Sequence, residues 1–332
     1  MSPSGKDKMR SQNTQREGNM SGRKKVTIVG GGQTGGIMAY RLAEKNICDI
    51  VIKDVPEFAQ HHGKALDIYQ GSSFAGFETT LTATDDWDAT AGSDVVVITS
   101  GAPRKPGMTR EELLQGNADV VGDYAAKNAI AQSPDATIIV FANPMDVMCH
   151  AALKATGLPR NRIIGQGGML DSSRFRTFIA METGVAPRDV HAFVLGGHTD
   201  ATMVPIVSQA RVGGIPLESL LPKDKIEAIV QRTMRGGAEL VELYKTGSAF
   251  LAPSVATMAM VESILLDEKR VLPCAVLLDG QYGIKDVFCG TMVKLGADGA
   301  EQVYEMPVSE EEEAKIVAAA SGTAELKAVI GA

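Results

Sequence analysis

The stretch KVTIVGGGQTGGIMAYRLAEKNICDIVIKD, residues 25–54, decides the fold. It opens with a short β-branched run, Lys25–Val29, that ends in glycines. A helical stretch follows from Ile37 to Lys45, and a second run rich in Ile and Val occupies Asp49–Lys53. β-Branched residues dominate both runs, and Ile50–Ile52 is continuously apolar, as in strands of a parallel sheet with both faces covered. The stretch therefore predicts the first β-α-β unit of a doubly wound α/β sheet.

The glycines of this stretch fit the pattern G-x-G-x-x-G between a strand and a helix, which is the context that a dinucleotide-binding loop requires. Gly30 allows the tight turn, Gly32 lets the backbone approach a pyrophosphate, and Gly35 lets helix and strand pack closely. The helix N-terminus would then meet the negative charge. A simple glycine-rich turn is the alternative. The predicted cofactor-binding residues of the loop are Gly30, Gly31, Gly32, Gln33, Thr34 and Gly35.

Asp54 stands at the end of the second predicted strand, 19 residues after Gly35. A carboxylate at this point accepts hydrogen bonds from the adenine ribose hydroxyls and repels a 2′-phosphate. We therefore predict NAD as the cofactor and add Asp54 to its binding residues.

The strand–helix alternation continues through the first half of the chain. Further strands are predicted at Thr79–Ala83, Asp94–Thr99 and Thr137–Phe141, and a long helix at about residues 110–132. Thr109 and Glu112 have the spacing of a capping box, which places the helix start directly after the Gly/Pro-rich loop 101–108. That loop follows a strand end, where open α/β sheets bind their ligands.

The pattern changes after about Gly165, where shorter strands mix with helices, as in Val190–Leu195, Ile226–Tyr244 and Pro253–Leu266. The predicted fold class is α/β, a Rossmann doubly wound parallel sheet followed by an α+β catalytic domain. The predicted division is a disordered tail at 1–22, an NAD-binding Rossmann domain at 23–165 and a catalytic, substrate-binding domain at 166–330. Glu310–Glu313 reads as the acidic first turn of a closing helix.

Composition narrows the class of protein. The chain has 332 residues, of which 44% are hydrophobic and 22% charged, as in a soluble globular protein. A formal net charge of −7 argues against nucleic acid and membrane surfaces as partners. The four cysteines are scattered without a C-x-x-C pair, so we expect reduced thiols, no metal site and a cytoplasmic location. No apolar run approaches the roughly 18 residues that span a bilayer.

Residues 1–22 are polar, with almost nothing to bury, which predicts a disordered tail. A transit peptide is the alternative, because the segment contains Arg and Ser. Asp7, Glu17 and the absence of an apolar helical face argue against it. Met20 is an alternative start.

A candidate acid–base centre lies in the second half. His198 follows an apolar strand in the tract Gly196-Gly197-His198, and Asp171 and Arg174 are three residues apart, so they share one helix face. A histidine held by a buried carboxylate can exchange protons near neutral pH. An arginine on the same face can bind a substrate carboxylate through two parallel hydrogen bonds.

From about Lys25 to Lys327 the sequence resembles the lactate/malate dehydrogenase family, and within it the malate dehydrogenases that are similar to lactate dehydrogenase. The motifs that carry the resemblance stand in family order at family spacing: GAPRKPGMTREELL, FANPMDVM, GQGGMLDSSRFR, GGH and KTGSAFLAP. The resemblance implies an enzyme of the tricarboxylic acid cycle that transfers a hydride reversibly between malate and oxaloacetate with NAD. It also implies a homotetramer or homodimer, with residues 63–68 in a subunit-contact helix.

The resemblance implies a role for each matching residue. His198 would be the general acid–base and Asp171 would hold its imidazole. Arg174 would bind the C1 carboxylate of the substrate, and Arg110 would polarise the carbonyl of oxaloacetate. Asn143 would contact both substrate and cofactor, and Ser248 would contact the substrate beside the nicotinamide. The cofactor would also be contacted by Asn117, Phe141 and Ala142. Ser248 is equally well explained as an ordinary loop serine.

Arg104 decides the substrate, because lactate dehydrogenases typically carry an uncharged residue at this point of the loop. A guanidinium there can pair with the second carboxylate of malate, which lactate lacks, whereas a solvated loop arginine is the plain alternative. The competing functions are an L-lactate or other 2-hydroxyacid dehydrogenase and a catalytically silent NAD-binding protein.

Two departures from the family stand near the site. Thr199 replaces the usual glycine after the histidine, and a β-branched residue does not readily take a positive φ. Gly290-Thr291-Met292 replaces a tract that usually reads Gly-Val-Pro. Neither change removes a catalytic group.

Overall fold

The structure is a computed structural model that describes residues 22–101, 107 and 109–332. The predicted tail, apart from Gly22, lies outside the described residues, and so does the predicted substrate-binding residue Arg104.

The first half of the chain forms a parallel sheet with the strand order β3-β2-β1-β4-β5-β6. Order and direction are those of a doubly wound Rossmann sheet, so the predicted fold class is confirmed. Its strands are β1 (Lys25–Val29), β2 (Asp49–Lys53), β3 (Leu81–Thr84), β4 (Val95–Ile98), β5 (Thr137–Val140) and β6 (Ile163–Gly165).

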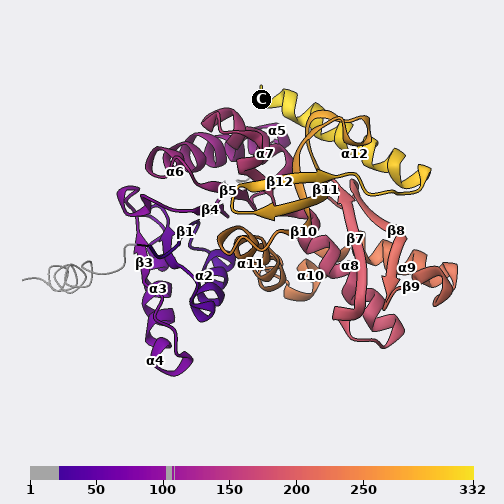
Figure 1. The fold of residues 1–332 in the computed structure, drawn as a ribbon. Coiled ribbons are helices and arrows are strands. Elements are labelled where there is room, and N and C mark those ends of the chain that lie inside the picture. Colours follow the sequence, from indigo (N-terminus) through magenta and orange to yellow (C-terminus); the bar gives the residue numbers. More distant parts are fainter. Residues whose placement is uncertain (1–21, 102–106, 108) are drawn as a thin grey trace, which may run out of the picture.

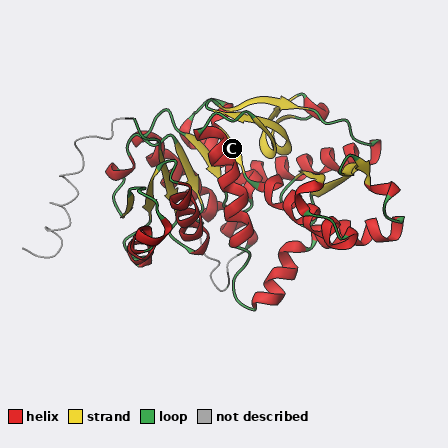
Figure 2. Cartoon of the chain, turned by 60° about the horizontal axis from the view of Figure 1, so that its bottom comes forward, coloured by secondary structure: helices red, strands yellow, loops and turns green. Residues whose placement is uncertain are grey.

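Helices cover both faces of this sheet (Figures 1 and 2). The side chains of β4 alternate between two cores: Val95 and Val97 pack into one cluster, and Val96 and Ile98 into another. The helices of this half are α2 (Gln33–Lys45), α3 (Gln60–Gln70), α4 (Ser72–Ala75), α5 (Arg110–Ala118), a π-helical segment (Asp119–Ala126), α6 (Lys127–Gln132) and α7 (Met145–Thr156).

The second half continues the same sheet with mainly antiparallel strands, in the order β10-β11-β7-β8-β9, and β12 pairs with β11. One residue pair joins the halves, Gly165 with Ala275. A second single pair, Gly196 with Gly290, joins two strands within the second half. The strands are β7 (Val190–Gly196), β8 (Met203–Val212), β9 (Ile215–Pro216), β10 (Arg270–Asp279), β11 (Lys285–Gly296) and β12 (Gly299–Tyr304). The helices are α8 (Gly167–Thr183), α9 (Lys223–Met234), α10 (Gly236–Tyr244), α11 (Leu251–Leu265) and α12 (Glu310–Val329).

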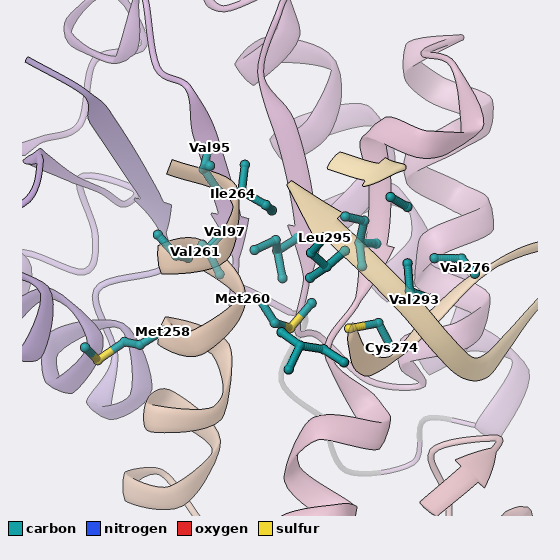
Figure 3. Close-up of a cluster of buried hydrophobic side chains, with 14 of the residues drawn as sticks. Val95, Val97, Met258, Met260, Val261, Ile264, Cys274, Val276, Val293 and Leu295 are labelled. Atoms are coloured by element: carbon teal, nitrogen blue, oxygen red, sulfur yellow. The ribbon is translucent and has the colours of Figure 1, made fainter. Parts of the chain in front are cut away.

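Helix α11 joins the two halves through a shared apolar core. Figure 3 shows its side chains lying between Val95 and Val97 of the parallel sheet and Val293 and Leu295 of β11. The buried residues that α11 contributes are Met258, Met260, Val261, Ile264 and Leu265, all at most 7% exposed. Helix α11 thereby holds the parallel sheet against β11 of the second half.

The predicted strand Thr79–Ala83 is displaced to β3 at Leu81–Thr84. Local predictions of helices differ from the structure at three further points. The predicted helix 110–132 is helical throughout, but its middle is π-helical over Asp119–Ala126. The single stretch Ile226–Tyr244 is divided at Arg235 into α9 and α10. Helix α2 begins at Gln33, not Ile37, because the glycine loop leads directly into its first turn. Among the described residues, no helix is long and apolar enough to cross a membrane.

Candidate active site

The loop between β1 and α2 is shaped by its glycines. Gly30 has a φ of 114°, and a Cβ there would lie 2.4 Å from Thr99 Oγ1. A Cβ on Gly35 would lie 1.9 Å from the Gly30 carbonyl oxygen. At Gly32, in contrast, no atom of the described residues lies within 4 Å of a Cβ position. The loop is therefore closed where helix and strand pack and open where a pyrophosphate would approach.

Helix α2 presents an uncapped N-terminus at this opening, because Gly32 provides no side chain for its first-turn N–H groups. Gln33 and Thr34 form that first turn, and the Ser254 hydroxyl of α11 donates to the Thr34 carbonyl at 3.0 Å. Free first-turn amides favour a bound anion, so the loop fits the pyrophosphate of a dinucleotide.

Asp54 lies beside the same loop, directly after β2. Its Oδ2 accepts the backbone N–H of Gly31 at 2.6 Å, and its Oδ1 accepts that of Val55 at 2.8 Å. The side chain is half-buried. A fixed carboxylate therefore lies next to the glycine loop. A ribose hydroxyl could donate to this carboxylate in place of, or together with, the two backbone N–H groups.

His198, Asp171 and Arg174 form a connected triad. Asp171, on the buried face of α8, is 1% exposed, and its Oδ2 lies 2.7 Å from His198 Nδ1. Its Oδ1 accepts from Arg174 Nη1 at 3.1 Å. His198 lies in the turn between β7 and β8. Helix α8 and the end of β7 therefore bring Asp171 and His198 together, although they are 27 positions apart in the sequence.

The charges around His198 favour its protonated form. Burial acts to lower the pKa of the imidazole, because the charged ring loses water. The charge and hydrogen bond of Asp171 act in the opposite direction, helped by the charge of Asp146 and opposed by Arg174. The net effect raises the pKa of His198 above its ordinary 6.5. Such a group can both take and return a proton near neutral pH.

Asn143 and Asn117 are joined at the end of β5. The Asn117 side-chain amide donates to the Asn143 carbonyl oxygen at 3.1 Å. Asn143 is exposed, whereas Ala142 is 6% exposed and Phe141 half-buried. Phe141, Ala142 and Asn143 follow the carboxyl end of β5, which lies next to β4, on the same edge of the sheet as the glycine loop after β1.

Arg110 and Ser248 stand apart from the triad. Arg110 is exposed in the first turn of α5, between Thr109 and Glu112, which form a complete capping box. Ser248 is exposed in the loop between α10 and α11. Within the described residues, no hydrogen bond or ion pair links either one to His198 or Asp171.

The two departures near the site have local explanations. Thr199 does not take a positive φ, and its hydroxyl lies 2.7 Å from that of Thr202 in the turn after His198. Gly290 is needed where β11 meets β7, because a Cβ there would lie 2.7 Å from the Gly196 carbonyl oxygen. Thr291 is buried, and its hydroxyl donates to the Tyr304 carbonyl.

Asp146 was missed by the sequence reasoning. It is 5% exposed near the start of α7, and its Oδ2 accepts the backbone N–H of His198 at 2.9 Å. Its position in the segment FANPMDVM gave no indication of this contact, since the partner is a backbone group 52 residues away.

Known proteins are similar to this chain in sequence and in fold. Residues 24–165 match the family model of the lactate/malate dehydrogenase, NAD binding domain, and residues 168–331 match that of the lactate/malate dehydrogenase, alpha/beta C-terminal domain. A malate dehydrogenase from Roseiflexus sp. (strain RS-1) is 47% identical over 311 residues, covering 92% of this chain and 100% of the relative.

Two solved structures are similar over nearly the whole chain. The apo form of the malate dehydrogenase from Picrophilus torridus superposes with a TM-score of 0.88 at 41% identity, covering 93% of this chain and 97% of that one. A Cryptosporidium parvum lactate dehydrogenase complexed with lactic acid and nicotinamide adenine dinucleotide has a TM-score of 0.89 at 38% identity, covering 94% and 99%. Malate dehydrogenases and lactate dehydrogenases therefore have the same fold, and the fold alone does not distinguish the two activities.

Proposed function

The chain belongs to the lactate/malate dehydrogenase family, and we propose that it interconverts malate and oxaloacetate with NAD, using His198 as the general acid–base. The activity is that of an NAD-dependent oxidoreductase acting on a CH–OH group. Its curated relatives are malate dehydrogenases, so the lactate or other 2-hydroxyacid dehydrogenase is not favoured.

The contact between His198 Nδ1 and Asp171 Oδ2 at 2.7 Å carries the proposal. With Nδ1 bound to the carboxylate, the other ring nitrogen, Nε2, is left to exchange a proton with the substrate hydroxyl. Asp171 fixes the orientation of the ring and stabilises the imidazolium that forms when malate gives up its proton. In the reverse direction His198 returns the proton to the oxygen of oxaloacetate.

NAD accepts the hydride from malate and returns it to oxaloacetate. Its pyrophosphate would be held by the glycine loop, residues Gly30, Gly31, Gly32, Gln33, Thr34 and Gly35. Asp54 would bind its adenine ribose. The nicotinamide end would be held by Asn117, Phe141, Ala142 and Asn143. The division of labour would follow the two halves of the chain, with cofactor binding in residues 23–165 and substrate binding in residues 166–330.

Arginines would bind the dianionic substrate. Arg174 is the candidate for the C1 carboxylate, because its guanidinium lies against Asp171 with its Nε buried and without a partner among the described residues. Arg110 would polarise the substrate carbonyl from the loop side, and Asn143 and Ser248 would add hydrogen bonds. Arg104 would pair with the distal carboxylate, which distinguishes oxaloacetate from pyruvate.

The exposed apolar side chains of α3 and α4 support an oligomer. Leu66 is 47% exposed, Tyr69 46% and Phe74 98%, and an apolar surface of this kind marks a contact site in many proteins. We place this surface in a homodimer or homotetramer. A cytoplasmic location, a role in the tricarboxylic acid cycle and the absence of nucleic-acid partners complete the proposal, in keeping with the net charge of −7.

The test is a comparison of oxaloacetate and pyruvate as substrates for NADH oxidation. We expect kcat/KM for oxaloacetate to exceed that for pyruvate by about 10²-fold or more, which corresponds to about 3 kcal/mol. A preference for pyruvate would identify a lactate dehydrogenase. NADH binding without turnover of either substrate would identify a silent NAD-binding protein.

A further inference from the structure

Asp146 places a second carboxylate next to the proton-carrying histidine. It lies in the first turn of α7, in the first half of the chain, whereas His198 lies in the second half. Its Oδ2 accepts the backbone N–H of His198 at 2.9 Å, so it fixes the main chain that carries the imidazole. Its Oδ1 is buried and has no hydrogen-bond partner in the part of the chain that the structure describes.

The groups that face Asp146 come from four elements. Asp171 of α8 repels it and His198 of the β7–β8 turn attracts it. Cys149 of α7 and Cys289 of β11 face it as buried neutral thiols, whose pKa values burial raises first and the charge of Asp146 raises further. Arg174 lies on the far side of Asp171, which it contacts at 3.1 Å.

Asp146 has no cation in direct contact within the described residues. Burial therefore raises its pKa to about 6, even though the backbone N–H and the charge of His198 act to lower it. At neutral pH and above, the fold holds a buried carboxylate with one oxygen unpaired, and such a group destabilises a folded protein. An asparagine would accept the same hydrogen bond without the charge.

A destabilising charge that touches the acid–base residue has a functional explanation. The imidazole of His198 is held by Asp171 on its ring and by Asp146 on its backbone, so two negative charges surround one titrating group. Groups of this kind cluster at sites where a protonation state is tuned.

We propose that Asp146 is a positioning residue that fixes the backbone of His198 and adds a second negative charge to hold the proton on its imidazole. The inference rests on the proposed function of His198. Asp171 orients the ring, whereas Asp146 acts through the main chain and through its charge alone.

The variant Asp146→Asn separates charge from hydrogen bond. It should shift the midpoint of the pH dependence of kcat/KM for oxaloacetate reduction downward by about one pH unit, as removal of one nearby charge predicts. The plateau rate should stay close to that of the wild type. Asp146→Ala, which also removes the acceptor, should lower the plateau rate as well. Asp123→Asn, at an exposed aspartate, is the matched control and should shift nothing.

NMR of carbon-13-labelled histidine measures the titration midpoint of the His198 imidazole directly, without turnover. The resonance is identified by its loss in His198→Asn, and its midpoint should fall in Asp146→Asn. A midpoint within about 0.2 pH units of the wild type, with an unchanged rate profile, would overturn the proposal for Asp146 and leave that for His198 intact.

The reciprocal experiment covers the case in which Asp146→Asn does not fold. In His198→Asn the carboxyl of Asp146 loses the attraction of the imidazolium but keeps the backbone N–H, so it should titrate at a higher pH than in the wild type. Carbon-13 labelling of the aspartate carboxyls measures this. An unchanged titration of Asp146 would contradict the coupling.

Discussion

At the residue scale, the proposed chemistry depends on one imidazole and its carboxylate. Asp171 is 1% exposed and accepts from both His198 and Arg174, so its charge is shared between the proton carrier and the proposed carboxylate-binding arginine. Removal of either partner would leave this buried aspartate less well compensated.

His198→Asn should lower kcat by about 10²–10⁴-fold, the usual contribution of general acid–base catalysis, while NADH binding changes little. Asparagine can still donate to Asp171 but cannot carry the proton. Steady-state rates and a fluorescence titration with NADH measure the two effects. His191→Asn, at the exposed histidine of β7, is the control. Wild-type turnover in His198→Asn would remove the histidine from the mechanism.

Arg104→Gln should change the substrate preference. Oxaloacetate would lose a charge-assisted hydrogen bond, and pyruvate would no longer leave a guanidinium unpaired. Both effects shift the ratio of kcat/KM values in favour of pyruvate, by about 10²–10³-fold or more for about 3–5 kcal/mol. The neighbouring Lys105→Gln is the control. A change in the ratio of less than about threefold in Arg104→Gln would make Arg104 a solvated loop residue.

The sequence could predict the residues that chemistry and spacing identify, and not those that act through the main chain. Asp171 and Arg174 share a helix face because they are three residues apart, and His198 follows a strand end. Asp146 accepts from a backbone group of a remote turn, and no side-chain pattern encodes such a contact. Only the packing of α7 against the second half brings it there.

At the scale of elements, we expect the β1–α2–β2 unit to set cofactor choice. Asp54 at the end of β2 is fixed by two backbone N–H groups, so its charge stays where a 2′-phosphate would lie. Asp54→Asn keeps the acceptor for Gly31 and removes the repulsion. The preference for NADH over NADPH should therefore fall by about tenfold or more, about 1.4 kcal/mol. The ratio of kcat/KM values for the two cofactors measures it, with Glu57→Gln as an exposed control. An unchanged ratio would assign the selectivity to another group.

The contact between α7 and β11 makes stability depend on pH through His150. This residue is 3% exposed, and its Nε2 accepts the backbone N–H of Phe288 at 3.1 Å. Burial, with a smaller effect of Lys327, lowers its pKa from 6.5 to about 3. Between these values the unfolded chain binds a proton at this site and the folded chain does not, so acid favours unfolding.

His150→Gln should therefore make stability less sensitive to acid. Glutamine can accept from Phe288 but does not titrate. From about pH 7.5 to about pH 5, the wild type should lose about 2 kcal/mol more of its free energy of unfolding than the variant. Urea unfolding at the two pH values measures this, with His191→Gln as the exposed control. Equal losses in wild type and His150→Gln would show that His150 is protonated in the folded state.

Predictions of elements were most successful where the pattern is long and local. The capping box at Thr109 and the acidic first turn at Glu310–Glu313 both begin helices as expected. The π-helical turns at Asp119–Ala126 were not predicted, because a shift of hydrogen-bond register leaves the helical periodicity almost unchanged. The break at Arg235 was missed because neither proline nor a polar cluster marks it, although Gly236 and Gly237 follow.

At the scale of the whole molecule, the site is assembled by contacts that cross the junction of the two halves. Ser254 of α11 holds the glycine loop through the Thr34 carbonyl, and Asp146 of α7 holds the backbone of His198. Ser254 lies on α11, whose apolar core is shown in Figure 3. The buried apolar side chains of α7 pack in a different apolar cluster. The sequence predicted two folding units but not that one sheet runs through both, because a single residue pair, Gly165 with Ala275, makes the connection.

Whether His198 is the shared acid–base group is measured by the pH dependence of kcat/KM in both directions, for oxaloacetate with NADH and for malate with NAD. Reduction needs His198 protonated and oxidation needs it neutral, so the first should fall and the second should rise as pH increases through the pKa of His198, which lies above its ordinary value. Profiles of opposite slope are the predicted result. Two profiles that change in the same direction, or that stay flat from about pH 5 to about pH 9, would contradict the assignment of one shared acid–base group.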